Sequence, residues 1–244
     1  MKPAPEVDAR IDALGRSLAE ALGHAVACIA VYGSAAGEDF SPSHSDVNLL
    51  VVLREVSFAD LRLFGETLLR SARSGLRIAT PLVLTPSFLR DARDSYPIEI
   101  ADIRDRHRVI VGEDLVAGLT VDRECLREQA EREVRGKLLK LRALAVLRPT
   151  DADVQQALAS AAATFAIIER ALLHLSNDGT APRGAALFEE VGRRQGVPIQ
   201  ALRRLTRLRA DGGPWPSGTE LDELLAAVLR EVEALVAYVD GSTA

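Results

Sequence analysis

Apolar residues follow two different periods along the chain, and the change between them divides the sequence in two. Up to about residue 118, short β-branched runs alternate with segments of helical spacing. Beyond that point, every periodic segment repeats at intervals of three and four residues, which is the period of an amphipathic helix. The pattern predicts an α+β domain over residues 1–118, built on a small mixed sheet with helices, and an all-α bundle over residues 119–244.

The first half predicts strands separated by helices. The expected strands are Ala25–Tyr32, Ser45–Leu53, Arg77–Leu84 and Val109–Val111, and the expected helices are Val7–Leu22, Phe58–Ala72 and Pro86–Ala92. Pro81 lies inside the third of these strands. Because proline cannot donate a hydrogen bond to a neighbouring strand, we expect this strand at a sheet edge or at a bulge.

The second half predicts five helices. They cover about Val121–Leu147, Asp151–Ser176, Ala186–Gln195, Ile199–Arg209 and Glu220–Val239. The second of them is apolar on most sides, which favours a place in the middle of the bundle. Its uncharged stretch is shorter than about 20 strongly apolar residues, so we expect no membrane span.

Composition excludes some functions without selecting one. The chain has 244 residues and a net charge of −5, whereas a dedicated duplex-DNA binder normally carries a basic surplus, so there is no strong nucleic-acid signal. Cys28 and Cys125 have neither metal-ligand nor disulfide spacing and are expected to be buried free thiols. The first eight residues lack the apolar core of a signal peptide. We expect a soluble cytoplasmic protein without a membrane partner.

The segment Val31–Leu53 carries the functional signal. A predicted strand ends in Gly33-Ser34, about a dozen polar or small residues follow, and Asp46 and Asn48 then open a second apolar strand. Glycine lets a backbone approach a ligand closely, and a serine hydroxyl with nearby amides can donate to phosphate oxygens. Asp46 and Asn48 are two residues apart at a strand start, so their side chains share one face. The segment therefore combines a phosphate cradle with a pair of groups able to ligate a metal.

On these residues, the chain resembles the nucleotidyltransferase superfamily with the DNA polymerase β-type fold, and its helical half looks like the bundle attached in aminoglycoside nucleotidyltransferase-type members. The resemblance also extends to a bacterial branch with a GS…SDxN variant of the motif. In the family, Gly-Ser grips a nucleoside triphosphate. Three carboxylates hold two Mg²⁺ ions that activate an acceptor hydroxyl for attack on the α-phosphate. The resemblance assigns Gly33 and Ser34 to phosphate binding and Asp46 to the first carboxylate.

The sequence departs from the family at the other two carboxylates. Asn48 replaces the second, and Val83, within the segment PLVLT, stands at the third. Two divalent ions about 3.8 Å apart repel by roughly 17 kcal/mol at an effective dielectric of about 20, while each carboxylate returns roughly 16. Losing two of three carboxylates therefore removes more attraction than the repulsion it has to offset, which argues against a standard two-metal centre. We expect a nucleotidyltransferase-fold pseudoenzyme that binds nucleotide or phosphate weakly, with Mg²⁺ only when a nucleotide brings it.

Two alternatives stay open. The first is an active Mg²⁺-dependent transferase that moves a nucleoside monophosphate from a triphosphate to a small molecule or a protein. It would use Asp46 and Asn48 as metal ligands and Glu99 as the substitute acid; Glu38, Asp39 and His44 are further candidates in the loop. Lys137 and Lys140, three apart on one predicted helix, would contact the phosphates in either case. The second alternative is a non-catalytic regulatory or interaction protein.

Overall fold

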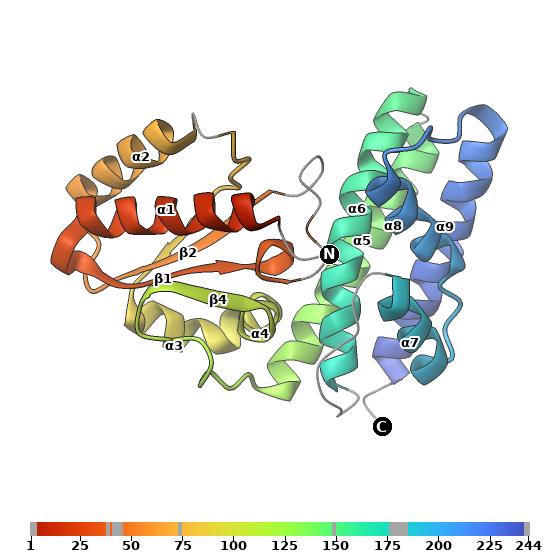
Figure 1. The fold of residues 1–244 in the computed structure, drawn as a ribbon. Coiled ribbons are helices and arrows are strands. Elements are labelled where there is room, and N and C mark those ends of the chain that lie inside the picture. Colours follow the sequence, from red (N-terminus) through yellow and green to blue (C-terminus); the bar gives the residue numbers. More distant parts are fainter. Residues whose placement is uncertain are drawn as a thin grey trace. The chain divides into compact units, whose positions relative to one another are not determined.

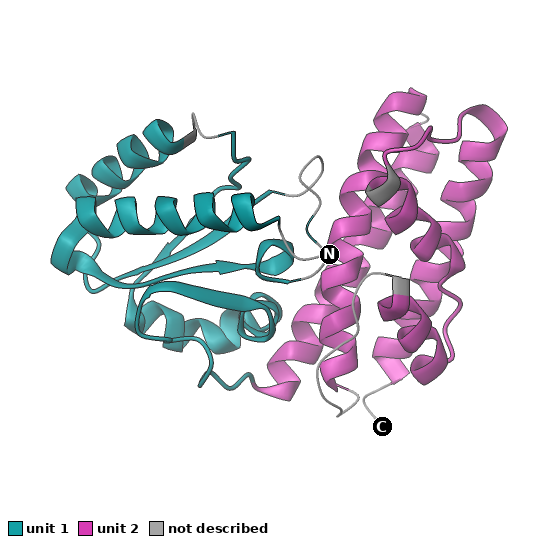
Figure 2. Ribbon diagram, in the orientation of Figure 1, with its two compact units in different colours: residues 1–121 teal, residues 122–244 magenta. Residues whose placement is uncertain are grey.

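A computed structural model describes residues 4–37, 40, 46–72, 75–147, 150–175 and 185–241. The chain divides into two compact units, Met1–Val121 and Asp122–Ala244 (Figure 2). The first unit contains the sheet and the second is helical, so the fold class is α+β followed by an all-α bundle, as the apolar periods predict.

The described part of the first unit is built on a four-stranded mixed sheet in the order β3-β2-β1-β4. The strands are β1 (Val26–Tyr32), β2 (Asn48–Leu53), β3 (Leu82–Leu84) and β4 (His107–Gly112). β1 runs antiparallel to both β2 and β4, and β2 runs parallel to β3. β3 is thus an edge strand, as Pro81 predicts. Its register against β2 also slips by one residue between the Val47–Ile78 bridge and the Leu50–Leu82 pair.

Two helices cover each face of this sheet (Figure 1). They are α1 (Pro5–Leu22) and α2 (Phe58–Ala72) on one face, and α3 (Pro86–Ser95) and α4 (Pro97–Asp105) on the other. Successive residues of a strand point to opposite faces. Leu49 and Val51 accordingly join the core under α1 and α2, while Leu50 and Val52 join the core under α3 and α4. Both faces of β2 are therefore buried, which explains its unbroken apolar run.

α4 is the element that the apolar pattern missed. Its four apolar residues Ile98, Ile100, Ala101 and Ile103 are all buried, so it lacks the one-sided stripe that identifies a surface helix. The alternation of Ile98, Glu99 and Ile100 also imitates a half-buried strand. Burial in the folded unit, and not the local apolar pattern, makes this segment a helix.

In its described residues, the second unit has five helices close to the predicted ranges. They are α5 (Arg123–Leu147), α6 (Asp151–Leu175), α7 (Ala185–Gln195), α8 (Gln200–Asp211) and α9 (Gly218–Gly241). α6 packs against α5, α7, α8 and α9, which is the central position that its apolar surface predicts. Among the described helices, α6 alone is long and apolar enough to cross a membrane, and half of that apolar window is buried within the unit. Core helices of soluble bundles meet the same test of length and composition.

The two cysteines are free thiols, as expected. Cys28 is fully buried on β1, where burial raises the pKa of its thiol. Cys125 is only half-buried, so the expectation of two buried thiols is wrong for this residue. It lies in the first turn of α5, where one side of a helix end stays open to solvent.

Candidate functional site

The structure brings Gly33 and Asn48 together at one end of the sheet. Gly33 begins the short 3₁₀ helix η2 (Gly33–Ala36) directly after β1, and Asn48 begins β2 beside Tyr32. Gly33 has a φ of 73°, and a Cβ added to it would lie 3.0 Å from Asn48 Nδ2. A side chain at position 33 would thus be strained by its backbone and crowded by its neighbour. Only glycine lets the turn and the strand approach this closely.

Gly33 and Ser34 differ in what they can offer to a phosphate. The Gly33 N–H donates to the carbonyl of Arg106 at 2.9 Å, so this amide serves the fold. Ser34 is half-buried in the same turn and carries a hydroxyl, which can both donate and accept a hydrogen bond. Of the two residues assigned to phosphate binding, Ser34 has the side-chain donor and Gly33 provides the room.

Asp46 lies two residues before Asn48 and forms an ion pair that its sequence position did not predict. Its Oδ1 is 3.0 Å from Nε of Arg77, and the two side chains are 46% and 57% exposed. Arg77 precedes β3, in the segment that pairs with the residues before β2. A guanidinium therefore lies against the carboxylate that the family resemblance assigns to a metal.

Strand register explains why Arg77 reaches Asp46. Val47 pairs with Ile78, the Val47 N–H donates to Arg77 O, and the Ala79 N–H donates to Val47 O. Val47 and Ile78 both join the core under α1 and α2, so the residues beside them point to the opposite face. Arg77 and Ala79 thus share a face with Asp46 and Asn48.

The alignment that put Val83 at the third carboxylate is wrong. Val83 pairs with Val51, three residues further along β2 than Asn48, and it joins the core under α1 and α2. It therefore lies on the face opposite to Asn48. The positions level with Asp46 and Asn48 are Arg77 and Ala79, and the conclusion that this strand offers no acid is unchanged. A basic residue at the start of an acid-free third strand was the signal in the sequence for Arg77.

Glu99 is exposed in the first turn of α4, on the side of the sheet that Asn48 faces. Burial raises the pKa of the Tyr32 hydroxyl, and the negative charges of Asp102 and Glu99 raise it further. Tyr32 is the strand partner of Asn48. Asp102 is committed to Arg106, whose Nη2 lies 3.0 Å from its Oδ1.

These residues do not fit a resident pair of Mg²⁺ ions. Among the described residues, no three His, Cys, Asp or Glu side chains are arranged to hold a metal. Asn48 offers one neutral carbonyl oxygen, and Arg77 brings a positive charge to Asp46. A divalent ion about 4 Å from a guanidinium is repelled by about 2 kcal/mol in water and about 8 kcal/mol at an effective dielectric of about 20. Asp46 and Asn48 as metal ligands stay a prediction that this geometry disfavours.

Lys137 and Lys140 lie on α5, in the helical unit, so their predicted contact with phosphates at Gly33 remains untested. Lys137 is half-buried and Lys140 is exposed. The neighbouring arginines are used within that unit: Arg135 pairs with Asp240 and Arg142 with Glu233. The loop candidates Glu38, Asp39 and His44 lie outside the described residues.

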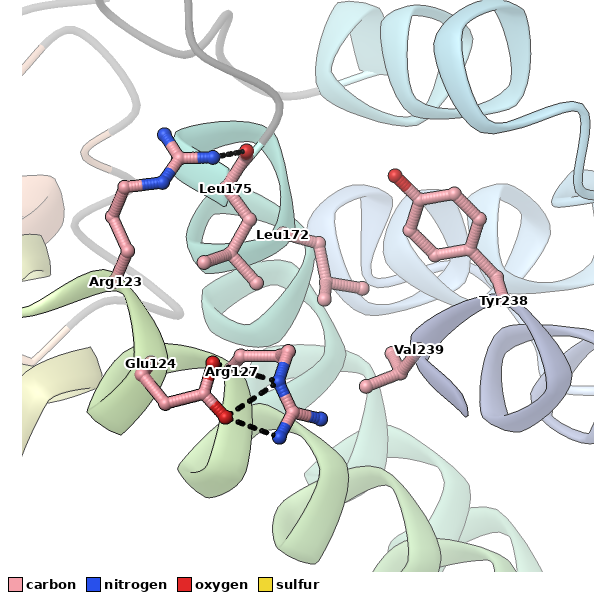
Figure 3. A pocket seen from close by; sticks show the side chains of 7 residues that line it. All are labelled: Arg123, Glu124, Arg127, Leu172, Leu175, Tyr238 and Val239. Carbon is pink, nitrogen blue, oxygen red and sulfur yellow. Dashed lines mark hydrogen bonds and ion pairs between the residues drawn. The ribbon is translucent and has the colours of Figure 1, made fainter. Parts of the chain in front are cut away.

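A separate hollow of about 250 Å³ lies within the helical unit (Figure 3). Its lining consists of Arg123, Glu124, Arg127, Leu172, Leu175, Tyr238 and Val239. Arg127 is held by Glu124 at 2.6 Å and by Glu131 at 3.3 Å, so much of its charge is neutralised on α5 itself. None of the predicted site residues lines this hollow.

In architecture, the chain has the fold of the polymerase β-type nucleotidyltransferases, which confirms the resemblance read from Gly33, Ser34 and Asp46 at the level of the fold. The structure resembles the crystal structure of spectinomycin adenyltransferase AAD(9) from Enterococcus faecialis with ATP and spectinomycin. The TM-score is 0.58 at 13% sequence identity, and the match covers 93% of this chain and 99% of that one. No protein-family model matches the sequence. The comparison with curated protein sequences also gives no match.

Proposed function

We propose that this protein is a nucleotidyltransferase-fold pseudoenzyme that binds a nucleoside triphosphate, or another polyphosphate, weakly and does not transfer nucleotides. The observation that carries the proposal is the Asp46–Arg77 ion pair. It puts a cation beside the one carboxylate that remains, where transfer would need two more carboxylates to hold metal ions. Asn48 and Ala79 supply no negative charge on the same face.

Binding would use the groups gathered around the turn after β1. Gly33 leaves room for a ligand, the Ser34 hydroxyl can donate to a phosphate oxygen, and Asp46 fixes the polar end of β2 through Arg77. The related fold of AAD(9), solved with ATP, supports a nucleotide as the ligand class. With so few contacts, we expect a dissociation constant on the order of 0.1–1 mM, or about −4 to −5.5 kcal/mol.

Two measurements on the whole protein test the proposal. Isothermal titration with ATP should detect weak binding. Incubation with ATP labelled at the α-phosphate, with Mg²⁺ and spectinomycin as a trial acceptor, should transfer no label to the acceptor above the background of the buffer. If the wild type transfers the label and Asp46→Asn does not, the proposal that the protein has lost transfer is wrong. A melting temperature that no nucleotide shifts would favour the role of an interaction protein.

An active Mg²⁺-dependent transferase is the second candidate, and the observation in its favour is that Glu99 is exposed at the start of α4, on the side of the sheet that Asn48 faces. In that case a single Mg²⁺ would come with the triphosphate, and Glu99 would replace a missing carboxylate near the acceptor hydroxyl, where it could accept the proton of that hydroxyl. Transfer should then fall at least about a hundredfold in Glu99→Gln, as general-base loss usually does. The matched control is Glu66→Gln, an exposed carboxylate on α2 at the other face of the sheet. Equal rates in the two variants would exclude this role of Glu99.

A further inference from the structure

Arg77 stands out among the charged residues of the first unit because strand register, and not chance proximity, sets its partner. The Val47–Ile78 bridge and its two flanking backbone hydrogen bonds fix Arg77 level with Asp46 on one face of the sheet. Position 77 therefore delivers its side chain to the predicted ligand site whenever this strand pair forms. The pairing of these two strands therefore places the Asp46 and Arg77 side chains next to each other.

We propose that Arg77 is the cation of this site: it contacts the phosphates of the ligand directly and makes binding independent of Mg²⁺. The inference rests on the proposed function, because it assumes that a polyphosphate binds beside Gly33 and Ser34. It deepens that function by naming the group that replaces the metal. A guanidinium suits this task, since its planar array of five N–H donors matches phosphate oxygens and keeps its charge at any physiological pH.

The Asp46 ion pair is weak enough to be remodelled by a ligand. Both side chains are about half exposed, and exposed ion pairs contribute little to stability. A triphosphate carries several negative charges, so its attraction to the guanidinium exceeds that of the Asp46 carboxylate. In the absence of ligand, Asp46 keeps Arg77 oriented at the end of β2.

The direction in which Asp46→Asn changes the affinity for phosphate distinguishes this arrangement from a metal site. Where Asp46 ligates Mg²⁺ for a bound nucleotide, Asp46→Asn weakens nucleotide binding. Where Arg77 binds the phosphates, Asp46→Asn removes both a competitor for the guanidinium and a charge that repels the ligand. Phosphate binding then becomes tighter.

The experiment is isothermal titration of the whole protein with ATP and with inorganic tripolyphosphate, in EDTA and in Mg²⁺. We expect dissociation constants that agree within about twofold between the two buffers. Arg77→Gln should weaken binding about tenfold or more, as the loss of charge-assisted hydrogen bonds does. Arg62→Gln, an exposed arginine on α2, is the matched control and should bind as the wild type does. Asp46→Asn should bind a few times more tightly in EDTA.

Each result decides a different statement. Binding that requires Mg²⁺, or that Asp46→Asn weakens in EDTA, overturns the inference and leaves the proposed function standing. Binding in EDTA that Arg77→Gln does not change overturns the role of Arg77. Absence of binding in both buffers overturns the proposed function and the inference with it. Melting curves establish that each variant is folded, and Arg77→Lys, which keeps the charge, should recover part of the affinity.

Discussion

Gly33 shows how one residue serves both the fold and the site. Its φ of 73° lies in the left-handed region, and its α-carbon faces Asn48 Nδ2. Replacing it by alanine should destabilise the first unit by about 1–2 kcal/mol, through backbone strain and displacement of Asn48. Chemical denaturation measures this loss.

Gly65→Ala on α2 is the matched control for Gly33→Ala. No atom outside its own helix lies within 4 Å of a Cβ at position 65. Because alanine is the better helix former, the substitution should stabilise the protein by about 0.5–1 kcal/mol. Equal effects of the two substitutions would contradict the constraint at Gly33.

Glu169 is a fully buried titratable residue of the helical unit. It is 0% exposed, and neither carboxyl oxygen has a hydrogen-bond partner among the described residues. Burial raises the pKa of this carboxyl to about 8, and the negative charge of Glu231 acts in the same direction. Glu169 is therefore protonated in the folded protein at neutral pH, when the same residue of the unfolded chain is ionised.

The protonation of Glu169 makes stability fall as pH rises. Between the unfolded pKa of 4.5 and the folded pKa of about 8, the folded state holds one more proton than the unfolded state. Its stability should therefore decrease by about 1.4 kcal/mol per pH unit in that window and level off above it. Glu169→Gln should remove this slope, whereas the exposed Glu223→Gln should keep it. Denaturation at pH 5, 6, 7 and 8 measures both.

At the scale of elements, the third strand shows what the pattern of residues along the sequence can predict and what it cannot. Pro81 predicted an edge or a bulge correctly, because one missing N–H suffices to exclude a central position. The pattern did not give the register, since the slip between Ile78 and Leu82 depends on how the strand meets β2. One residue of slip exchanges the two faces. The position level with Asn48 is therefore Ala79 and not Val83, and Arg77 is level with Asp46.

The start of α8 depends on a side chain from α9. Both carboxylate oxygens of Glu231 accept backbone hydrogen bonds there, from Ala201 N at 2.8 Å and from Leu202 N at 2.9 Å. Glu231→Ala leaves two buried donors unpaired and should cost about 1–3 kcal/mol of stability. Glu231→Gln keeps one acceptor oxygen and should cost less. Amide hydrogen exchange at positions 201 and 202 should accelerate in Glu231→Ala, and unchanged exchange would contradict the capping role.

At the scale of the whole molecule, the chain consists of two units that each bury their own core. The sheet of the first unit is covered on both faces, and α6 is surrounded within the second. We expect fragments 1–121 and 122–244 to fold separately, because each retains its core when the chain is divided after Val121. Circular dichroism with thermal melting tests this, and a fragment 122–244 without a cooperative transition would contradict it. The domain boundary after residue 118 stays a prediction.

The sequence by itself determined the alternation of strands and helices, the edge position of the third strand and the Gly33–Ser34 turn, because apolar period and local backbone preference act over a few residues. It also predicted the loss of two of the family's three carboxylates, because Asn48 stands at the second position and the third strand contains no acid. Only the tertiary structure decided the pairing of Asp46 with Arg77, the helix at Glu99 and the isolation of Glu169. These depend on strand register and burial, which join residues far apart in the chain.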